Sequence, residues 1–177
     1  MTKQLHLLEM KLKRLLMKLK KSKSYNMKLY IYLIFVIINF PLNASECRNI
    51  KFSKTEIIIV NLKNDKKNQF SVDLADTKLK REIGLQCKKQ LKENEGMLFI
   101  WNSEAQRYFW MKNTKFNLDI IFINADFKIV DIFFGAKPFS LINISSSKKA
   151  QYVLELNEGV FKNLDLIIGD KLVFQKK

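Results

Sequence analysis

The sequence predicts a mainly β protein, a compact antiparallel sandwich or partly closed barrel with one or two short helices. Two observations support this prediction. Many short apolar runs rich in Ile, Val and Phe are separated by polar turn residues, and few long runs have helical periodicity. Short strands at this spacing are typical of sandwiches and barrels. The 177 residues suffice for one domain of ordinary size.

Nine segments have the apolar or alternating composition of strands. Polar turn residues at 64–68 and 124–126 each separate two of them, as in a hairpin. The predicted strands are, in order, Thr55–Leu62, Gln69–Ala75, Met97–Trp101, Arg107–Met111, Ile120–Ile123, Lys128–Phe133, Tyr152–Leu156, Leu166–Ile168 and Lys171–Phe174.

Two short helical segments are expected between the strands. Asp76 can cap a helix over Thr77–Ile83, because a carboxylate accepts bonds from the free N–H groups of a first turn. Gly84 would end that helix. Glu158–Asn163 is expected to form a helical turn near the end of the domain.

The net charge of +15 is unevenly distributed along the chain. Residues 1–45 carry nine Lys and Arg against a single acid, Glu9, whereas residues 46–177 carry 23 basic and 16 acidic residues. Lys, Ile, Asn and Phe are frequent throughout, as AT-rich coding sequences tend to give. The charge is therefore a weak indication of nucleic-acid binding, and we expect no nucleic-acid partner. In an exported protein such lysines would more readily meet anionic lipid or polymer.

Residues 27–45 have the pattern of a secretory signal peptide. A positive start at Met27 precedes the apolar run Leu29–Phe40, and small residues around Ala44 offer a cleavage position. A membrane-spanning helix needs about 20 apolar residues, so this run is short for a span. We expect an exported, periplasmic protein. The alternatives are a membrane anchor through residues 29–42 and a buried core helix.

Residues 1–26 form a basic stretch in which leucines recur at roughly helical spacing between lysines. Such an amphipathic segment could lie on an anionic membrane surface. The simpler interpretation is that translation begins at Met27 and that the stretch is an upstream extension. After the signal we expect a short N-terminal segment at 46–56 and a single β domain at 57–174.

The two cysteines, Cys47 and Cys87, both follow the expected cleavage position. In an oxidising compartment they could form a disulfide that closes a loop of about 40 residues. The alternative is a buried free thiol at Cys87 and an unpaired Cys47. Glu46 argues against lipid attachment at Cys47, because a small residue is expected in the preceding position.

The composition excludes several kinds of catalytic chemistry. His6 is the only histidine, and it lies in the segment expected to be removed. The mature chain would then lack a Ser-His-Asp triad and any histidine-ligated metal site. Two cysteines do not make a zinc site, and neither GxxxxGK[ST] nor GxGxxG occurs. We expect no metal and no cofactor.

Several motifs resemble the uncharacterised family called domain of unknown function 192. They are Arg81 followed by Gly84-Leu85, then GMLFIW at 96–101, FWMKNT at 109–114, LDIIFI at 118–123, YVLELNEG at 152–159 and a late Gly-Asp at 169–170. The resemblance covers about residues 57–174. It implies a compact, mainly antiparallel β structure with a short helix, in small exported or membrane-associated bacterial and archaeal proteins. It implies no reaction.

The stretch from Gly96 to Val130 places polar side chains among apolar and aromatic ones. Burying a polar group costs roughly a few kcal/mol unless it has a partner, so these residues form either a structural network or a site. The candidate binding residues, including two outside this stretch, are Arg81, Trp110, Lys112, Asn113, Asp119 and Glu155.

Each candidate also has a structural interpretation. Trp110 lines a cleft that suits a sugar or peptide, or it packs. Lys112 neutralises an anionic ligand, or it extends to solvent. Asn113 follows the strand and could bond local backbone to fix a turn. Asp119 accepts backbone N–H bonds or pairs with a basic residue such as Arg81, or else it serves as a general acid or base.

The preferred interpretation is a small, monomeric, non-catalytic β domain at the cell envelope that binds an unknown ligand or envelope component. The first alternative is a hydrolase or transferase that uses Asp119 and Glu155 as a pair of carboxylates, as glycosidases do. The second alternative is a structural accessory protein of the envelope, which would present an apolar patch to a partner protein.

Overall fold

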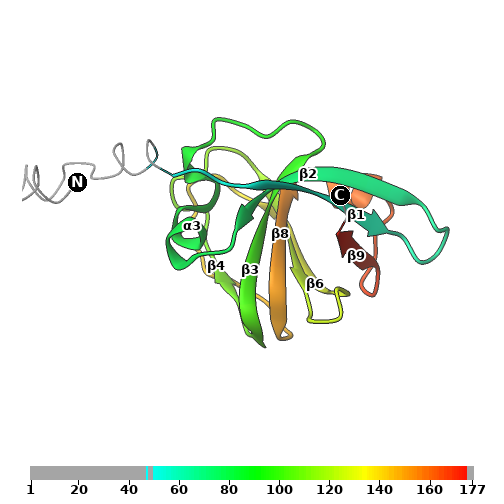
Figure 1. Cartoon of the computed structure of the whole chain (residues 1–177). Helices are drawn as coiled ribbons and strands as arrows, with labels where there is room; N and C mark the ends of the chain where they lie inside the picture. The colour runs from blue at the N-terminus through cyan, green and yellow to red at the C-terminus, as the bar shows by residue number, and fades with distance from the viewer. Residues whose placement is uncertain (1–46, 48–49, 175–177) are drawn as a thin grey trace, which may run out of the picture. The chain divides into compact units, whose positions relative to one another are not determined.

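Seven strands form one curled sheet in the order β6-β5-β8-β3-β2-β1-β9, and β4 and β7 form a separate two-stranded sheet (Figure 1). The computed structural model describes Cys47 and residues 50–174. The strands are β1 (Lys54–Val60), β2 (Lys67–Ala75), β3 (Glu95–Ala105), β4 (Tyr108–Phe109), β5 (Leu118–Ile123), β6 (Ile129–Ala136), β7 (Ile144–Ser145), β8 (Ala150–Asn157) and β9 (Lys171–Phe174). The helices are α3 (Lys78–Ile83), the 3-10 helix η3 (Gly84–Cys87) and α4 (Val160–Asn163). The predicted mainly β fold class is confirmed.

Antiparallel pairing joins every neighbouring pair in the large sheet except β2 and β3. The predicted hairpin of β1 and β2 is present, with Thr55 opposite Val72. β2 and β3 pair in parallel because α3 and η3 carry the chain from the end of β2 back to the start of β3.

The N-cap of the short helix α3 lies one residue later than predicted. Thr77 is the N-cap, and its hydroxyl accepts a bond from the Lys80 N–H at 3.3 Å. The prediction that Asp76 caps the helix is therefore wrong. Asp76 forms an ion pair with the Lys80 ammonium at 2.8 Å instead. Gly84 ends the helix with a φ of 50°, where a residue without a Cβ is favoured.

The predicted strand at Leu166–Ile168 is wrong, because this segment is a loop closed by Asp170. The buried Asp170 carboxylate accepts bonds from the backbone N–H of Ile167 and of Leu62, both at 2.8 Å. These two bonds hold the loop against the end of β1, so the local backbone is satisfied without a strand ladder.

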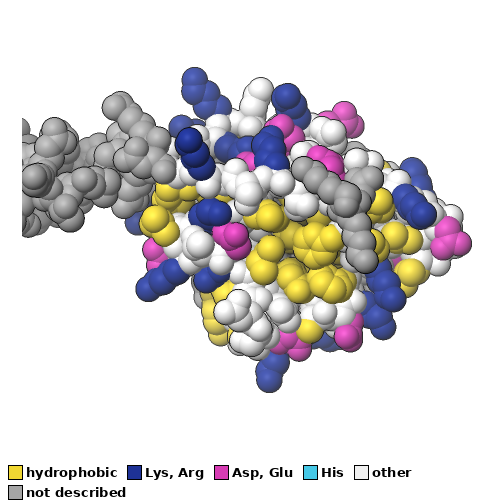
Figure 2. Space-filling view, viewed as in Figure 1, with side chains coloured by type: hydrophobic (Ala, Val, Ile, Leu, Met, Phe, Trp, Pro, Cys, Tyr) yellow, Lys and Arg dark blue, Asp and Glu magenta, His cyan; other side chains and the backbone are white. Residues whose placement is uncertain are grey.

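The large sheet curls into a half-barrel, and an isolated bridge links its edge strand β9 to the turn between β5 and β6. The Ile129 N–H donates to the Asp170 carbonyl, and the Leu172 N–H donates to the Phe127 carbonyl, each at 2.8 Å. β9 is thereby joined to the hairpin between β5 and β6 (Figure 1). Figure 2 shows hydrophobic side chains gathered over β6, β8 and β9 on the visible face.

Apolar clusters cover both faces of the central strands. One cluster lies inside the curl and includes Ile121 and Leu154 together with Phe161 of α4. The other cluster lies on the opposite face and includes Phe122 and Val153 together with residues of η3, β7 and the loop after β4. Because successive residues of a strand point to opposite faces, each central strand contributes to both clusters. A polar residue in these strands therefore enters one cluster or the other.

The predicted extension at 1–26, the signal peptide at 27–45 and the alternative anchor at 29–42 lie outside the described residues. In the part of the chain that the structure describes, no helix combines the length and hydropathy that a membrane span requires.

Candidate functional site

A cavity of about 430 Å³ lies between α3 and η3 on one side and residues 108–114 on the other. We call it the Glu155 pocket. Its lining is aromatic and charged and consists of Lys78, Arg81, Glu82, Ile83, Gly84, Leu85, Gln86, Phe99, Trp101, Tyr108, Phe109, Trp110, Lys112, Thr114 and Glu155. Four of the six predicted binding residues are therefore brought together here. They are Arg81, Trp110, Lys112 and Glu155.

Arg81 holds α3 against the sheet. Its Nη1 donates to the Asp76 carbonyl at 3.0 Å and to the Ile100 carbonyl of β3 at 2.8 Å. The helix packs closely here, since a Cβ on Gly84 would lie 3.3 Å from the Phe99 ring. Both acceptors are neutral, so the Arg81 charge is not cancelled by these bonds.

Two guanidinium groups approach the ring of Trp101. The guanidinium carbon of Arg81 is 5.2 Å from the ring centroid, and that of Arg107 is 4.2 Å from it. Arg107 is fixed by a bond from its Nε to the Ala150 carbonyl at 2.9 Å. Burial, and secondarily the charge of Arg81, lower the pKa of Arg107. Trp101 and Arg107 were not among the predicted binding residues. Trp101 is an aromatic residue at the end of the predicted strand Met97–Trp101, and this position could have indicated it.

Residues 108–110 present alternate side chains to opposite sides. Phe109 points inward, with its ring centroid 5.0 Å from that of Phe99. Tyr108 and Trp110 point outward and are 60% and 55% exposed. Lys112 lies near Trp110, with its Nζ 5.4 Å from the ring centroid. The pocket rim on this side is therefore two exposed aromatic rings and one ammonium.

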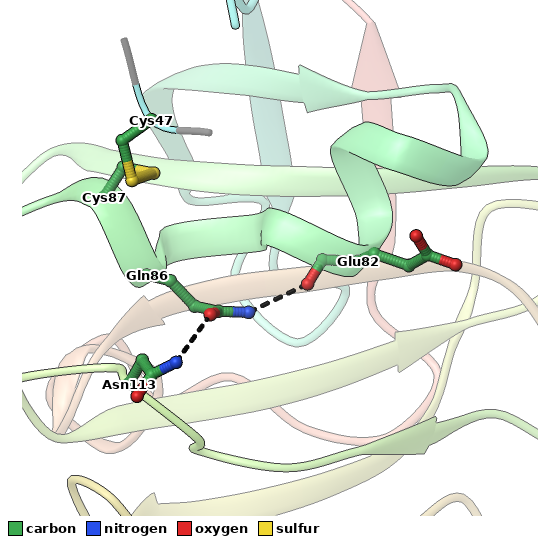
Figure 3. Close-up of a disulfide and its surroundings, with 5 residues drawn as sticks. All are labelled: Cys47, Glu82, Gln86, Cys87 and Asn113. Carbon is green, nitrogen blue, oxygen red and sulfur yellow. Dashed lines mark hydrogen bonds between the residues drawn. A yellow bond between two sulfur atoms is a disulfide. The ribbon is translucent and has the colours of Figure 1, made fainter. Parts of the chain in front are cut away.

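Asn113 joins the two walls of the pocket. Its Nδ2 donates to the Gln86 Oε1 at 3.1 Å, and the Gln86 Nε2 donates to the Glu82 carbonyl at 2.8 Å (Figure 3). Asn113 has a φ of 62°, a left-handed conformation that Asn tolerates better than most residues. The predicted role of Asn113 as a turn residue agrees with this conformation, although its side chain bonds η3 rather than local backbone.

A disulfide joins Cys47 to Cys87, the last residue of η3 (Figure 3). The two Cα atoms are 5.5 Å apart. The bond fixes the segment before β1 to the wall of the pocket that carries Gln86. The disulfide thus stabilises the same wall that Asn113 contacts.

Glu155 lies on the floor of the pocket and is only 4% exposed. It faces the second apolar cluster, opposite Met97 of β3 and Ile120 of β5. Among the described residues its carboxyl has no hydrogen bond and no ion pair. Burial raises the pKa of Glu155 to about 8. At neutral pH the group is therefore mostly protonated, and it can both donate and accept a hydrogen bond.

Asp119 is separated from the other candidates by the sheet. In the pairing of β5 with β8, Ile120 lies opposite Glu155 and Asp119 lies opposite Leu156, so the two carboxylates point to opposite faces. The hypothesis that they act as a catalytic pair is therefore wrong. The Asp119 carboxylate accepts the N–H bonds of Gly135 and Gly159 at 3.0 and 2.9 Å, a structural role that the sequence analysis had allowed.

A second, more open cavity of about 1130 Å³ lies on the Asp119 side. Its lining includes Lys63, Phe134 and Lys137, and Lys137 pairs with Glu158 at 3.2 Å. The polar groups of Asp119 and Glu158 already have partners there. Over the described residues, no three His, Cys, Asp or Glu side chains come close enough to bind a metal.

The fold is that of a small, mainly β domain with a curled seven-stranded sheet, and one of its cavities lies between a helix and an aromatic segment. The chain belongs to the DUF192 family, described as "Uncharacterized ACR, COG1430", whose sequence profile matches residues 59–174. No protein of curated function matches the chain.

The solved structures that are similar to this chain include two of bacterial proteins. A proposed transcription regulator from Sinorhizobium meliloti 1021 is 33% identical, with a TM-score of 0.69 over 71% of this chain and 97% of that one. A protein of unknown function from Novosphingobium aromaticivorans DSM 12444 is 26% identical, with a TM-score of 0.65 over 73% of this chain and 96% of that one. Both share the fold.

Proposed function

We propose that the protein is an exported, non-catalytic binding protein that takes a small ligand in the Glu155 pocket. The observation that carries this proposal is the Glu155 carboxyl, which is buried at the floor of an aromatic-lined cavity without a polar partner among the described residues. Burying a polar group without a partner costs roughly a few kcal/mol. A ligand that bonds this group would recover part of that cost.

The pocket has the size and lining that small-molecule sites usually have. Its volume of about 430 Å³ falls within the roughly 300–1,000 Å³ typical of ligand pockets. Such pockets combine apolar and aromatic walls with a few polar groups that orient the ligand. Here Phe99, Tyr108 and Trp110 would supply the walls, and Glu155 with Arg81 would supply the orienting groups.

A binding role is better supported than catalysis. Glycoside hydrolysis needs two carboxyl groups within about 5–10 Å on either side of one bond. Asp119 points to the other face of the sheet, so Glu155 is the only carboxyl of the described residues at the pocket floor. The other acid of the lining, Glu82, is more than half exposed and pairs with Lys78 at 3.9 Å.

The test is a ligand screen on the purified protein with two matched aromatic variants. Trp110→Ala removes an aromatic ring that is 55% exposed at the pocket, and Phe134→Ala removes one that is 58% exposed at the second cavity. A library of saccharides, amino acids and short peptides is screened by thermal shift and native mass spectrometry. We expect at least one ligand whose affinity falls tenfold or more in Trp110→Ala and is unchanged in Phe134→Ala.

If the affinity for the ligand falls only in Phe134→Ala, the ligand binds in the second cavity and not in the Glu155 pocket. The absence of any ligand in the screen would leave the structural accessory role as the better interpretation. Because both rings are more than half exposed, neither substitution should unfold the protein.

Export is supported by two features that are independent of the pocket. The signal-peptide pattern ends just before Cys47, and Cys47 pairs with Cys87. Disulfides persist mainly in oxidising compartments outside the cytosol. We expect cell fractionation to recover the protein outside the cytosol, with a mature N-terminus close to Ala44. A mature chain that starts before Met27 would contradict this proposal.

A DNA-binding role, suggested by the similarity to the proposed transcription regulator of S. meliloti, has less support in this chain. Among the described residues, α3 and α4 have six and four residues, too short for a helix that lies in the major groove. DNA binding that depends on salt would favour this role over ligand binding, provided that replacing Lys112 with a neutral residue leaves the DNA affinity unchanged.

A further inference from the structure

The Glu155 pocket combines unpaired cations, exposed aromatic rings and a carboxyl group. We propose that its ligand is an acidic saccharide, a short chain of sugar rings that carries an anionic substituent. The rings would lie on Tyr108 and Trp110, the anionic group would meet Arg81 and Lys112, and a hydroxyl would bond Glu155. This proposal rests on the binding function proposed above and names its ligand class.

The charges of the lining favour an anion. The pocket is lined by three cations, Lys78, Arg81 and Lys112, and by two acids, Glu82 and Glu155. Lys78 pairs with Glu82 at 3.9 Å. Arg81 donates to two backbone carbonyls and lies over the Trp101 ring. A hydrogen bond from Lys80, helped by the charge of Arg81, lowers the pKa of Asp76. Lys112 approaches the Trp110 ring, and among the described residues neither Lys112 nor Arg81 forms a close ion pair with a carboxylate. A ligand anion would be the counter-ion of both.

The aromatic rings favour a ligand with flat apolar surfaces. Tyr108 is the first residue of β4 and Trp110 directly follows this strand, and both rings line the pocket and are more than half exposed. The ring of Trp101 is less exposed and is approached by Arg81 and Arg107. Two exposed rings can each pack on the apolar face of a sugar ring.

The floor of the pocket favours a hydroxyl near the anion. A neutral Glu155 offers both a donor and an acceptor, which matches a sugar hydroxyl. An ionised Glu155 would repel the ligand anion. The charged and titratable groups that face it across the pocket are Lys78, Arg81 and Glu82 of α3 and Tyr108 and Lys112 of the opposite wall. Binding of an anion should therefore favour the protonated form of Glu155, and affinity should fall as the pH rises.

The first experiment compares acidic saccharides with neutral counterparts that have the same rings. The acidic probes are hexuronate oligomers of two to four residues and neutral oligomers to which sulfate or phosphate groups have been added. The methyl esters of the hexuronates are neutral counterparts. Each probe is titrated calorimetrically into the full chain. We expect at least one acidic series to bind tenfold or more tightly than its neutral counterpart. The series that binds most tightly identifies the anionic group as a carboxylate, a sulfate or a phosphate.

Matched lysine variants locate the anion. Lys112→Ala should weaken binding of the acidic probe about tenfold and leave binding of the methyl ester unchanged. Lys115→Ala, which removes an exposed lysine outside the pocket lining, should change neither affinity. Equal loss in the two variants would mean that the overall positive charge, and not the pocket, attracts the probe.

The pH dependence gives a second readout that uses Glu155. Because burial raises the pKa of Glu155 to about 8, affinity for the acidic probe should fall roughly 10- to 30-fold between pH 6.5 and 9.5. Glu155→Gln cannot ionise, so its affinity should not change over this range. A pH dependence that persists in the variant would overturn the role of Glu155.

The outcomes separate this proposal from the binding function itself. A neutral ligand that binds in the Glu155 pocket as tightly as its acidic form would overturn the acidic-saccharide proposal and leave the binding function standing. Failure of every acidic probe to bind at millimolar concentration would overturn the proposal as well. If no library compound binds in the pocket either, both proposals fail.

Discussion

Asp119 and Glu155 lie one position apart on the paired strands β5 and β8, yet their side chains leave the sheet on opposite faces. Asp119 is satisfied by two backbone N–H groups, whereas Glu155 has no polar partner among the described residues. Two buried carboxyl groups on neighbouring strands thus have opposite roles. The partnered group fixes the fold, and the unpartnered group lies at the floor of a pocket.

The stability of the protein should fall between pH 5 and pH 9 because of Glu155. Burial raises its pKa from an ordinary 4.5 to about 8 in the folded chain. Between these values the folded chain retains a proton that the unfolded chain has released, so the free energy of unfolding falls as pH rises. The contribution is fully present below pH 4.5 and is lost above pH 8, a change on the order of several kcal/mol. Urea unfolding at pH 5, 7 and 9 measures it.

Glu155→Gln is the matched control for this pH effect. The variant should have nearly the wild-type stability at pH 5 and a higher stability than wild type at pH 9. Partners lower the pKa values of Asp76, Asp131 and Glu158, so these three carboxyl groups titrate below this range. Parallel pH profiles for wild type and variant would show that Glu155 is not the group responsible.

Replacing Asp119 should destabilise the fold without affecting the pocket. Asp119→Ala leaves the N–H groups of Gly135 and Gly159 without their acceptor, which should cost about 2–4 kcal/mol. Asp119→Asn keeps one acceptor oxygen and should cost about half as much. Chemical denaturation at pH 7 gives both values. A variant of normal stability that has lost ligand binding would instead place Asp119 in a binding site.

Local sequence patterns were sufficient to predict most of the strands. Alternation and high Ile and Val content identified the β1–β2 hairpin, because a half-buried strand requires that pattern. The parallel pairing of β2 with β3 was not predictable, since the partner of a strand is set by tertiary packing and not by its own residues. The helix cap was wrongly assigned to Asp76 instead of Thr77, because both residue types cap helices well and the sequence alone does not separate them.

The candidate site was predicted in part. Arg81, Trp110, Lys112 and Glu155 come from three separate regions of the sequence and line one pocket. Asp119 was wrongly grouped with Glu155, because the face on which a side chain lies depends on the register of two strands. Trp101 was overlooked, since its importance comes from two arginines that only the fold brings to its ring.

Removing the disulfide should destabilise the protein and loosen one wall of the pocket. Cys47 and Cys87 are separated by 40 residues, and a loop of that length corresponds to about 4 kcal/mol in the chain-entropy model. Replacing both cysteines with serine should lower the free energy of unfolding by about this amount, as measured in urea. Amide exchange should also become faster in η3, which follows the helix that carries Arg81.

A reducing agent provides the control for the disulfide prediction. Reduced wild type should have the stability of the double serine variant, and the reducing agent should leave the variant itself unchanged. Equal stability of oxidised and reduced wild type would mean that the segment around Cys47 contributes little to the folded domain.

Gly96 should be the glycine least tolerant of substitution in the sheet. A Cβ at Gly96 would lie 2.6 Å from the Glu155 carbonyl oxygen and 2.7 Å from the Leu156 Cδ2. The carbonyl belongs to the central strand β8, which is paired on both sides and cannot move aside easily. Gly96→Ala should therefore cost about 3 kcal/mol or more, at the upper end of the range for overpacked cores.

The contrast with Gly169→Ala separates crowding from backbone strain. Gly169 has a φ of 103°, but no atom lies within 4 Å of the position that its Cβ would occupy. Its substitution should cost only the conformational strain, about 1–2 kcal/mol. Because relief of the clash at Gly96 must displace the backbone of Glu155, Gly96→Ala should also shift the pH at which stability falls. Equal costs for the two alanine variants, with an unshifted pH profile, would mean that β3 and β8 do not pack as closely as described.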